Sequence, residues 1–211
     1  MRNKLLLILI IVISFLSSFC NPSPDIKKTD NSLINILGYP KQELTKEIKP
    51  FVVTSGKYSF KITPKALYSI SAKVVSATTY SSDWNSKIAQ VDLALIWGDL
   101  VRDEYRKFIE FNQKNRWYFY RYYPEFPKDK QFIIEHSANN HMIPSTENIK
   151  KALKHISVGD NIKAKGYLVK VDTEMNGKRY WWNSSLSRKD SGDNSCELFY
   201  VLELKVNEKI Y

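Results

Sequence analysis

Two short polar segments of the chain combine residue types that could do chemistry. The first, residues 135–144, contains His136 and His141, two of the three histidines, with Glu135 adjacent. Imidazole and carboxylate groups bind metals, but this spacing matches neither a helical pair nor a zinc finger, and no ligand quartet is evident. We therefore predict no metal site and no cofactor. The segment is interpreted as a buried polar loop whose side chains satisfy main-chain groups.

The second segment, residues 184–197, places several serines and Cys196 on either side of a polar turn. A thiol or hydroxyl beside an imidazole can act as a nucleophile, so His141 with Cys196, or with a serine of residues 184–187, would suit a hydrolase or transferase. Against this, Cys196 alternates in phase with a row of apolar residues, which predicts an inert thiol in the core. The row is Leu198, Tyr200, Leu202, Leu204 and Val206.

These segments resemble those of an uncharacterised family of small exported bacterial proteins, with a Ser-Ala-Asn-x-His-x-Ile-Pro segment, a Gly-Tyr-Leu-Val strand and a Ser-Ser-Leu-x-Arg-x-Asp-x-Gly turn before Cys-Glu. The match covers roughly Val91 to Val201 and implies kinship without an activity. Its residues are Ser137, Ala138, Asn139, His141, Ile143, Pro144, Gly166, Tyr167, Leu168, Val169, Ser184, Ser185, Leu186, Arg188, Asp190, Gly192, Cys196 and Glu197.

The resemblance directs attention to one polar cluster where the two segments meet: Asn139, His141, Arg188 and Asp190. Both segments interrupt apolar elements that must pack together, and both carry groups that need partners. We expect the cluster to be structural first.

The rest of the chain is predicted to form mostly strands, in the ranges 58–62, 66–80, 91–97, 117–123, 132–134, 162–171, 180–186 and 196–206. One helix is predicted from Asp99 through residue 112, and a second from an N-cap at Ser145. Asn176-Gly177 predicts a hairpin turn, and Gly166 a bend. The fold class is therefore α+β, predominantly antiparallel β in a small barrel or curved sheet, with about two helices.

The first residues predict export. Basic residues precede an apolar stretch from Leu5 to Leu16 that is too short to span a bilayer, and Cys20 follows at the position of a lipoprotein acceptor cysteine. Phe19 occupies the position where that pattern has a small residue. The alternatives are a signal peptide cut elsewhere and an uncleaved anchor from Leu5 to Phe19.

The predicted domains are a signal peptide (1–19), a lipidated cysteine with a proline-rich tether (20–50) and one globular domain (51–211). With Cys20 acylated, the second cysteine has no intramolecular partner, so the domain must fold without a disulfide. The net charge of +10 is spread over the chain and indicates ordinary solvated surface.

We therefore expect a lipoprotein anchored in the bacterial cell envelope, facing the periplasm or the surface, that serves as a binding or structural module. An envelope glycan or a protein is the expected partner besides the membrane, and no nucleic acid is expected. The five tryptophans could provide stacking surfaces. The alternative is the envelope hydrolase or transferase using His141.

Overall fold

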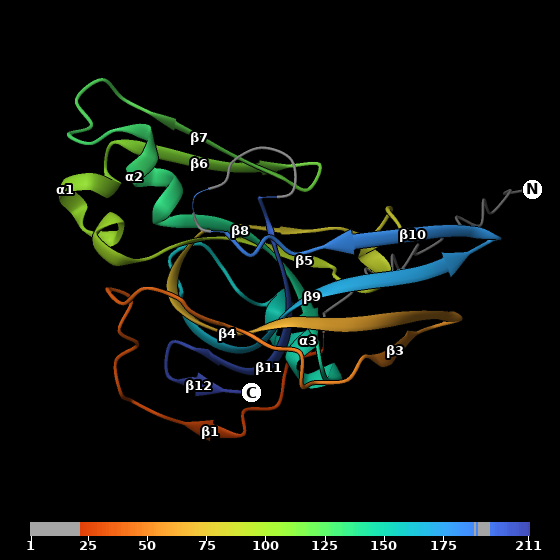
Figure 1. Ribbon diagram of the computed structural model, residues 1–211. Coiled ribbons are helices and arrows are strands. Elements are labelled where there is room, and N and C mark those ends of the chain that lie inside the picture. Colours follow the sequence, from red (N-terminus) through yellow and green to blue (C-terminus); the bar gives the residue numbers. More distant parts are fainter. Residues whose placement is uncertain (1–21, 188, 190–194) are drawn as a thin grey trace, which may run out of the picture.

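The computed structural model describes residues 22–187, 189 and 195–211. Within these residues, five strands close a small barrel (Figure 1). They are β4 (Tyr58–Thr79), β5 (Val91–Ile96), β8 (Ser137–Pro144), β9 (Asn161–Met175) and β11 (Glu197–Val206). The ring runs β4-β5-β8-β11-β9 and returns to β4, and every pair is antiparallel except β8 with β11. The predicted barrel-like, mainly antiparallel fold is confirmed.

In the sequence, helix α3 (Glu147–Lys154) follows β8 and precedes β9, the third and fourth strands of the barrel. Its apolar side chains Ile149, Ala152 and Leu153 pack into the cluster that fills the barrel. Thr146 caps it, since its hydroxyl accepts a hydrogen bond from the main-chain N–H of Ile149 at 3.2 Å. This strand order, with the parallel pair and this helix position, is the connectivity of an OB fold, a five-stranded Greek-key barrel.

Alternation along the barrel strands fills the interior with apolar side chains. Tyr68, Ile70 and Val74 of β4 meet Leu93 and Leu95 of β5 inside. A second apolar cluster lies where β4 and β9 extend beyond the barrel, joined by β3 (Phe51–Ser55) and β10 (Lys178–Asn183). The predicted turn at Asn176-Gly177 connects β9 and β10, and both of its residues have positive φ.

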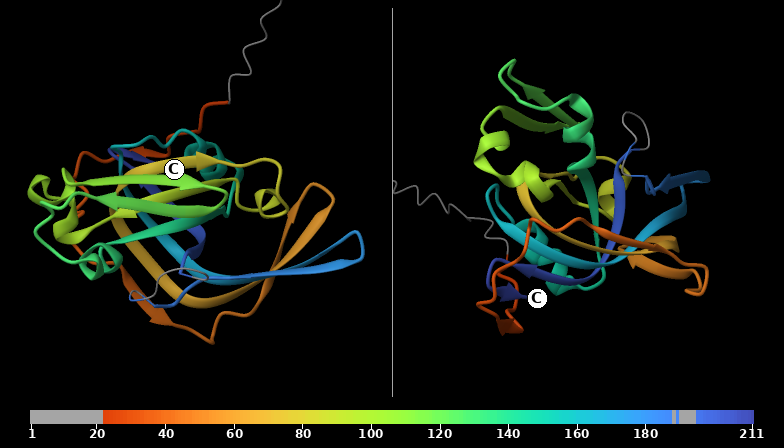
Figure 2. Two further views of the ribbon diagram at one scale, coloured as in Figure 1. Left: turned by 90° about the horizontal axis from the view of Figure 1, so that it is seen from above. Right: turned by 60° about the vertical axis from the view of Figure 1, so that its left-hand side comes forward.

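A two-stranded ribbon of β6 (Ile109–Lys114) and β7 (Trp117–Tyr122) stands on the outside of the barrel, over β5 and β8 (Figure 2). The short helices α1 (Asp103–Arg106) and α2 (Lys130–Glu135) flank it, and the 3-10 helices are η1 (Asn85–Lys87) and η2 (Gly98–Val101). The inner face of the ribbon packs on a third apolar cluster that includes Ala94 and Ile96 of β5. In this OB-like connectivity the ribbon is an insertion between the second and third strands of the barrel.

The segment predicted as a tether contributes strands to the sheet. β1 (Lys28–Thr29) pairs with β12 (Lys209–Ile210), and β2 (Lys41–Leu44) pairs with β4. No helix in the described ranges is long and apolar enough to cross a membrane.

Three predicted elements are wrong. Residues 132–134 belong to helix α2, which the Asp129 side chain caps by accepting from the N–H of Phe132 at 3.0 Å. The helix predicted from Asp99 to residue 112 is replaced by the 3-10 helix η2 and the short helix α1, which are separated by the extended residue Arg102; the chain then enters β6 and pairs with the aromatic strand β7. The segment 135–144, predicted as a loop, includes the buried strand β8.

The predicted single apolar face of residues 196–206 is also wrong. The register of β11 shifts between Val201 and Glu203, so that Leu202 points to solvent while Val201 and Leu204 both enter the barrel. A bulge of this kind changes the parity of a strand, and the alternation of residue types does not reveal it. Cys196 itself is only half-buried.

Candidate functional site

The turn of the ribbon brings Arg116 onto the outer face of the barrel. Asn115 and Arg116 both have positive φ (53° and 69°), as a two-residue turn with the twist of a hairpin requires. The N–H of Arg116 donates to the Tyr80 hydroxyl at 3.1 Å, and its carbonyl accepts from Nδ2 of Asn139 at 3.0 Å. The backbone of the turn is therefore fixed at two points.

The guanidinium of Arg116 binds two carboxylates. Its Nε and Nη2 donate to the two oxygens of Asp83 at 2.7 and 2.9 Å, and its Nη1 donates to Asp92 at 2.6 Å. The same group lies over the ring of Tyr80, 4.0 Å from its centre. Such a forked pair combined with ring stacking is a geometry that arginine adopts and lysine cannot reproduce.

Asp92 and His141, which lie on two neighbouring strands of the barrel, extend this group of polar contacts. Asp92 on β5 is opposite His141 on β8 and has no exposed surface. Its Oδ2 lies 2.9 Å from Nδ1 of the imidazole. The His141 ring packs against Trp182 of β10, with 4.4 Å between the ring centres.

Asn139 joins the ribbon to Cys196, the residue that precedes β11. Its Oδ1 accepts from Nε2 of Gln113 at 2.5 Å, while its Nδ2 is 3.7 Å from the sulfur of Cys196. We call Asp83, Asp92, Arg116, Asn139 and His141 together the Arg116 cluster. It connects the β4–β5 loop, the ribbon, β5 and β8.

Charge pairing outweighs burial in this cluster. Burial alone would raise the pKa of Asp83, but hydrogen bonds and the positive charge of Arg116 hold the pKa below its usual value. Likewise, burial would lower the pKa of Arg116, and the two carboxylates raise it instead. Both groups are therefore charged throughout the physiological pH range.

The structure places two of the four predicted cluster residues, Asn139 and His141, on the outward face of β8, both linked to Arg116. Arg188 and Asp190 lie outside the described residues, as does Cys20.

Sequence reasoning missed Arg116, Asp83 and Asp92. One signal was available, because Asp92 interrupts the apolar run 91–97 and a buried carboxylate needs a partner.

The geometry at His141 gives little support to nucleophilic catalysis. Its described contacts are the Asp92 carboxylate and the Trp182 ring, and its side chain is 4% exposed. The Ser184 hydroxyl donates to the Ser185 carbonyl and accepts from the N–H of Leu198. A general base must reach the proton it removes, and the described contacts of this imidazole include no hydroxyl or thiol.

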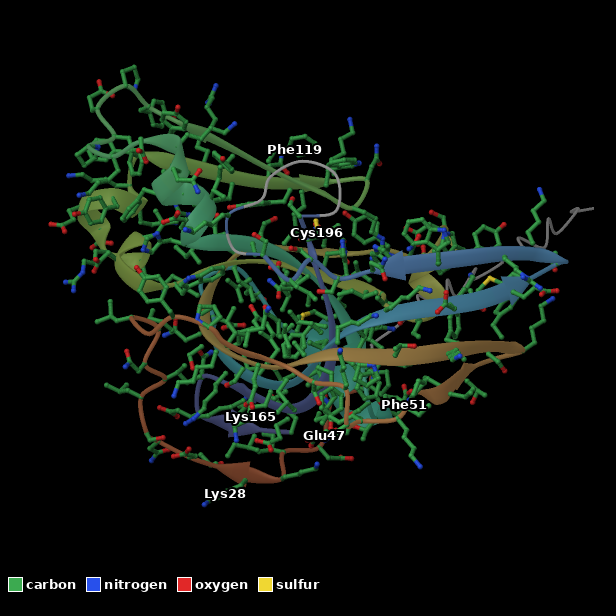
Figure 3. All side chains as sticks on the ribbon, in the orientation of Figure 1. Lys28, Glu47, Phe51, Phe119, Lys165 and Cys196 are labelled. Atoms are coloured by element: carbon green, nitrogen blue, oxygen red, sulfur yellow. The ribbon has the colours of Figure 1, made fainter. Side chains whose placement is uncertain are left out.

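The outer face of the ribbon carries exposed aromatic rings. Tyr118 and Tyr120 of β7 turn inward onto the third apolar cluster, so the alternating residues Trp117 and Phe119 turn outward. They remain 45% and 51% exposed. Figure 3 shows Phe119 at the upper edge of the molecule. We call Trp117 and Phe119 the aromatic face.

The neighbouring tryptophans of β10 point in opposite directions. Trp182 packs inward on His141 and Trp84, while Trp181 is 62% exposed. Trp181 borders a shallow groove with Val52 and Lys61 on strands β3 and β4. It is an exposed aromatic side chain on a face of the domain other than the aromatic face.

Among the residues that the structure describes, no group of three or more His, Cys, Asp or Glu side chains could hold a metal ion. Comparison of the chain with models of known families, with curated proteins and with solved structures gave no match. An OB-like barrel supports many functions, so the fold alone does not assign one.

Proposed function

We propose that this protein is a membrane-tethered lipoprotein of the bacterial cell envelope that binds an envelope glycan through the aromatic face. The observation that carries the proposal is that Trp117 and Phe119 stay exposed on a ribbon whose other face is buried. When a flat ligand covers exposed aromatic rings of this size, their apolar surface is removed from water, and this favours binding.

The ribbon is suited to binding because it is held rigidly. Arg116 fixes the turn directly before Trp117 through main-chain and charged contacts. A ligand that stacks on a preformed surface loses less conformational entropy than one that must first order it. Lys114, opposite Trp117 in the ribbon, adds a cation for an acidic group of the ligand.

Lipidation is supported by the leader and by Cys20 in the sequence. Replacing Cys20 by Ala should abolish metabolic labelling with a fatty acid, and it should release the protein from membranes or leave an uncleaved precursor. A variant that is still labelled would exclude Cys20 as the acceptor.

The glycan part of the proposal is tested by co-sedimentation with purified cell-wall sacculi. The double variant Trp117→Ala/Phe119→Ala should bind about tenfold more weakly, which corresponds to about 1.4 kcal/mol. Trp181→Ala removes a comparably exposed ring from another face and should bind like the wild type. If only Trp181→Ala loses binding, the groove beside β10 is the ligand site and the aromatic face is not.

A further inference from the structure

The N-terminal segment is bound to the barrel almost from the point where the described residues begin. The N–H of Asp25 donates to Oδ1 of Asn148 at 2.7 Å, and Nδ2 of Asn148 donates back to the Asp25 carbonyl at 2.8 Å. Asn148 lies in the first turn of α3. Two residues later, directly before β1, the N–H of Lys27 donates to the carbonyl of Ile210 at 2.9 Å.

Side chains hold the same segment further along. Nζ of Lys205 donates to Asp30 at 2.8 Å and to the carbonyl of Ser32 at 2.8 Å. The hydrogen bond from Lys205 holds the pKa of Asp30 well below its usual range. The Tyr39 hydroxyl lies 2.6 Å from Nε2 of His136, just before β2 joins the sheet. The chain is thus attached to the barrel from Asp25 to Leu44.

The chain length between Cys20 and Asp25 sets how far the barrel can lie from an anchor. Four residues separate them, and two of these, Pro22 and Pro24, are prolines. Fully extended, five residue steps span about 18 Å at most. The barrel therefore cannot turn an arbitrary side to the bilayer.

We infer that, in the lipidated protein, the side of the barrel formed by α3, β1 and β12 lies against the membrane surface; this rests on the proposed lipid anchor at Cys20. Asp25 is bound beside α3 (Figure 2), and the segment between Cys20 and Asp25 is too short to extend around the barrel to its other side. We call α3, β1 and β12 the anchor side.

The chemistry of the anchor side fits the phosphates of a bilayer surface. Helix α3 carries Lys150, Lys151 and Lys154, while β1 adds Lys28, which is exposed. Lysine ammonium groups close to an anionic lipid surface are attracted to it, and the attraction falls off within a Debye length. Of the three α3 lysines, Lys150 is also paired with Glu147 at 3.1 Å.

This orientation turns the aromatic face away from the membrane. The ribbon and strands β1 and β12 lie on opposite sides of the barrel (Figure 1), and Lys28 and Phe119 mark opposite edges in Figure 3. A polymer in the envelope would therefore meet Trp117 and Phe119 without obstruction by the bilayer.

The inference is tested by acetylating the lysines of the full-length lipidated protein in vesicles of phosphatidylethanolamine and phosphatidylglycerol, with mass-spectrometric readout. The same chain without residues 1–20, which has neither leader nor acyl chain, is mixed with the same vesicles as the reference. We expect Lys28, Lys151 and Lys154 to react several-fold more slowly in the lipidated protein. Lys114 on the ribbon and Lys178 on β10, both exposed, should react equally in the two.

A matched control lengthens the tether. A Gly-Ser linker of about twelve residues, inserted between Pro24 and Asp25, has a mean span of about 20 Å and should return the rates of Lys151 and Lys154 toward the reference. Uniform rates in a protein that carries the fatty acid would overturn the orientation and leave the anchor intact. If instead the wild-type protein itself carries no fatty acid and stays off the vesicles, the lipoprotein proposal is refuted.

Discussion

Arg116 is the residue on which the arrangement of the ribbon depends most. It occupies a left-handed backbone conformation that is unfavourable for a residue with a side chain, and five polar contacts of its backbone and guanidinium compensate for this. Its side chain is 13% exposed and that of Asp92 is fully buried. Removing one partner of such a pair leaves an uncompensated charge.

Arg116→Ala should therefore lower the free energy of unfolding by about 3 to 5 kcal/mol, because the Asp92 carboxylate loses its charged partner inside the protein. Urea denaturation monitored by tryptophan fluorescence measures this. Arg121→Ala breaks an exposed pair with Glu110 and should cost less than about 1 kcal/mol. Equal losses in the two variants would show that the cluster does not support the ribbon.

Asp83 makes the stability depend on pH on the acid side. Its pKa is lowered in the folded protein, so its contribution is complete above its unfolded pKa of about 3.9 and is lost as the pH falls through the lower folded value. We expect the stability difference between wild type and Asp83→Asn to shrink as the pH falls below about 4. Urea titrations at several pH values measure it, and a difference independent of pH would contradict the assignment.

Residue types identified two of the five residues of this cluster, Asn139 and His141, and for a clear reason. Asn139 and His141 are polar residues beside apolar elements, which marks them as groups that need partners. Arg116 looks like an ordinary turn residue, because its partners Asp83 and Asp92 are more than twenty residues away. Pairing at that separation follows from the closed barrel and not from any local pattern.

At the scale of elements, Gly166 lets β9 approach β11. A Cβ atom at this position would lie 1.9 Å from the carbonyl oxygen of Tyr200. Because the obstacle is main chain within the sheet, no side-chain movement relieves it.

Gly166→Ala should therefore destabilise the protein by about 3 kcal/mol or more, at the upper end for overpacking. Gly38→Ala is the control, since its Cβ would meet the nearest atom at an ordinary 3.8 Å, and its effect should stay within about 0.5 kcal/mol. Thermal unfolding compares the two. A Gly166→Ala protein as stable as the Gly38→Ala protein would mean that β9 and β11 are less closely apposed than in this structure.

Elements with a strong period were predictable and short ones were not. The existence of β4, β9 and β11, the β9–β10 turn and helix α3 follows from alternation, turn residues and helical spacing. The details differ: the helix cap is Thr146 and not the predicted Ser145, and the predicted strands 58–62 and 66–80 are one continuous strand, β4. Helix α2 was missed because three apolar residues fit a strand or a helix equally well, and its cap at Asp129 went unused. Strand β8 was missed because the polar residues on its outer face lie against protein and not water: Asn139 pairs with the ribbon, and His141 lies against Asp92 of β5.

For the whole molecule, the sequence predicts a small barrel or curved sheet as a fold class, but it does not predict which strands pair to close the barrel. The parallel pairing of β8 with β11 and the insertion of the ribbon join segments that are far apart in the chain. Together they produce a molecule with two distinct sides, one carrying α3 and the entering chain and the other carrying the aromatic face.

Binding of an envelope glycan to the aromatic face is tested most directly by hydrogen exchange of the full-length protein with and without soluble cell-wall fragments. We expect slower exchange in peptides covering β6 and β7, and no such change in the Trp117→Ala/Phe119→Ala protein. Slower exchange confined to peptides covering β10, or unchanged exchange throughout at saturating fragment, would contradict the proposed binding surface.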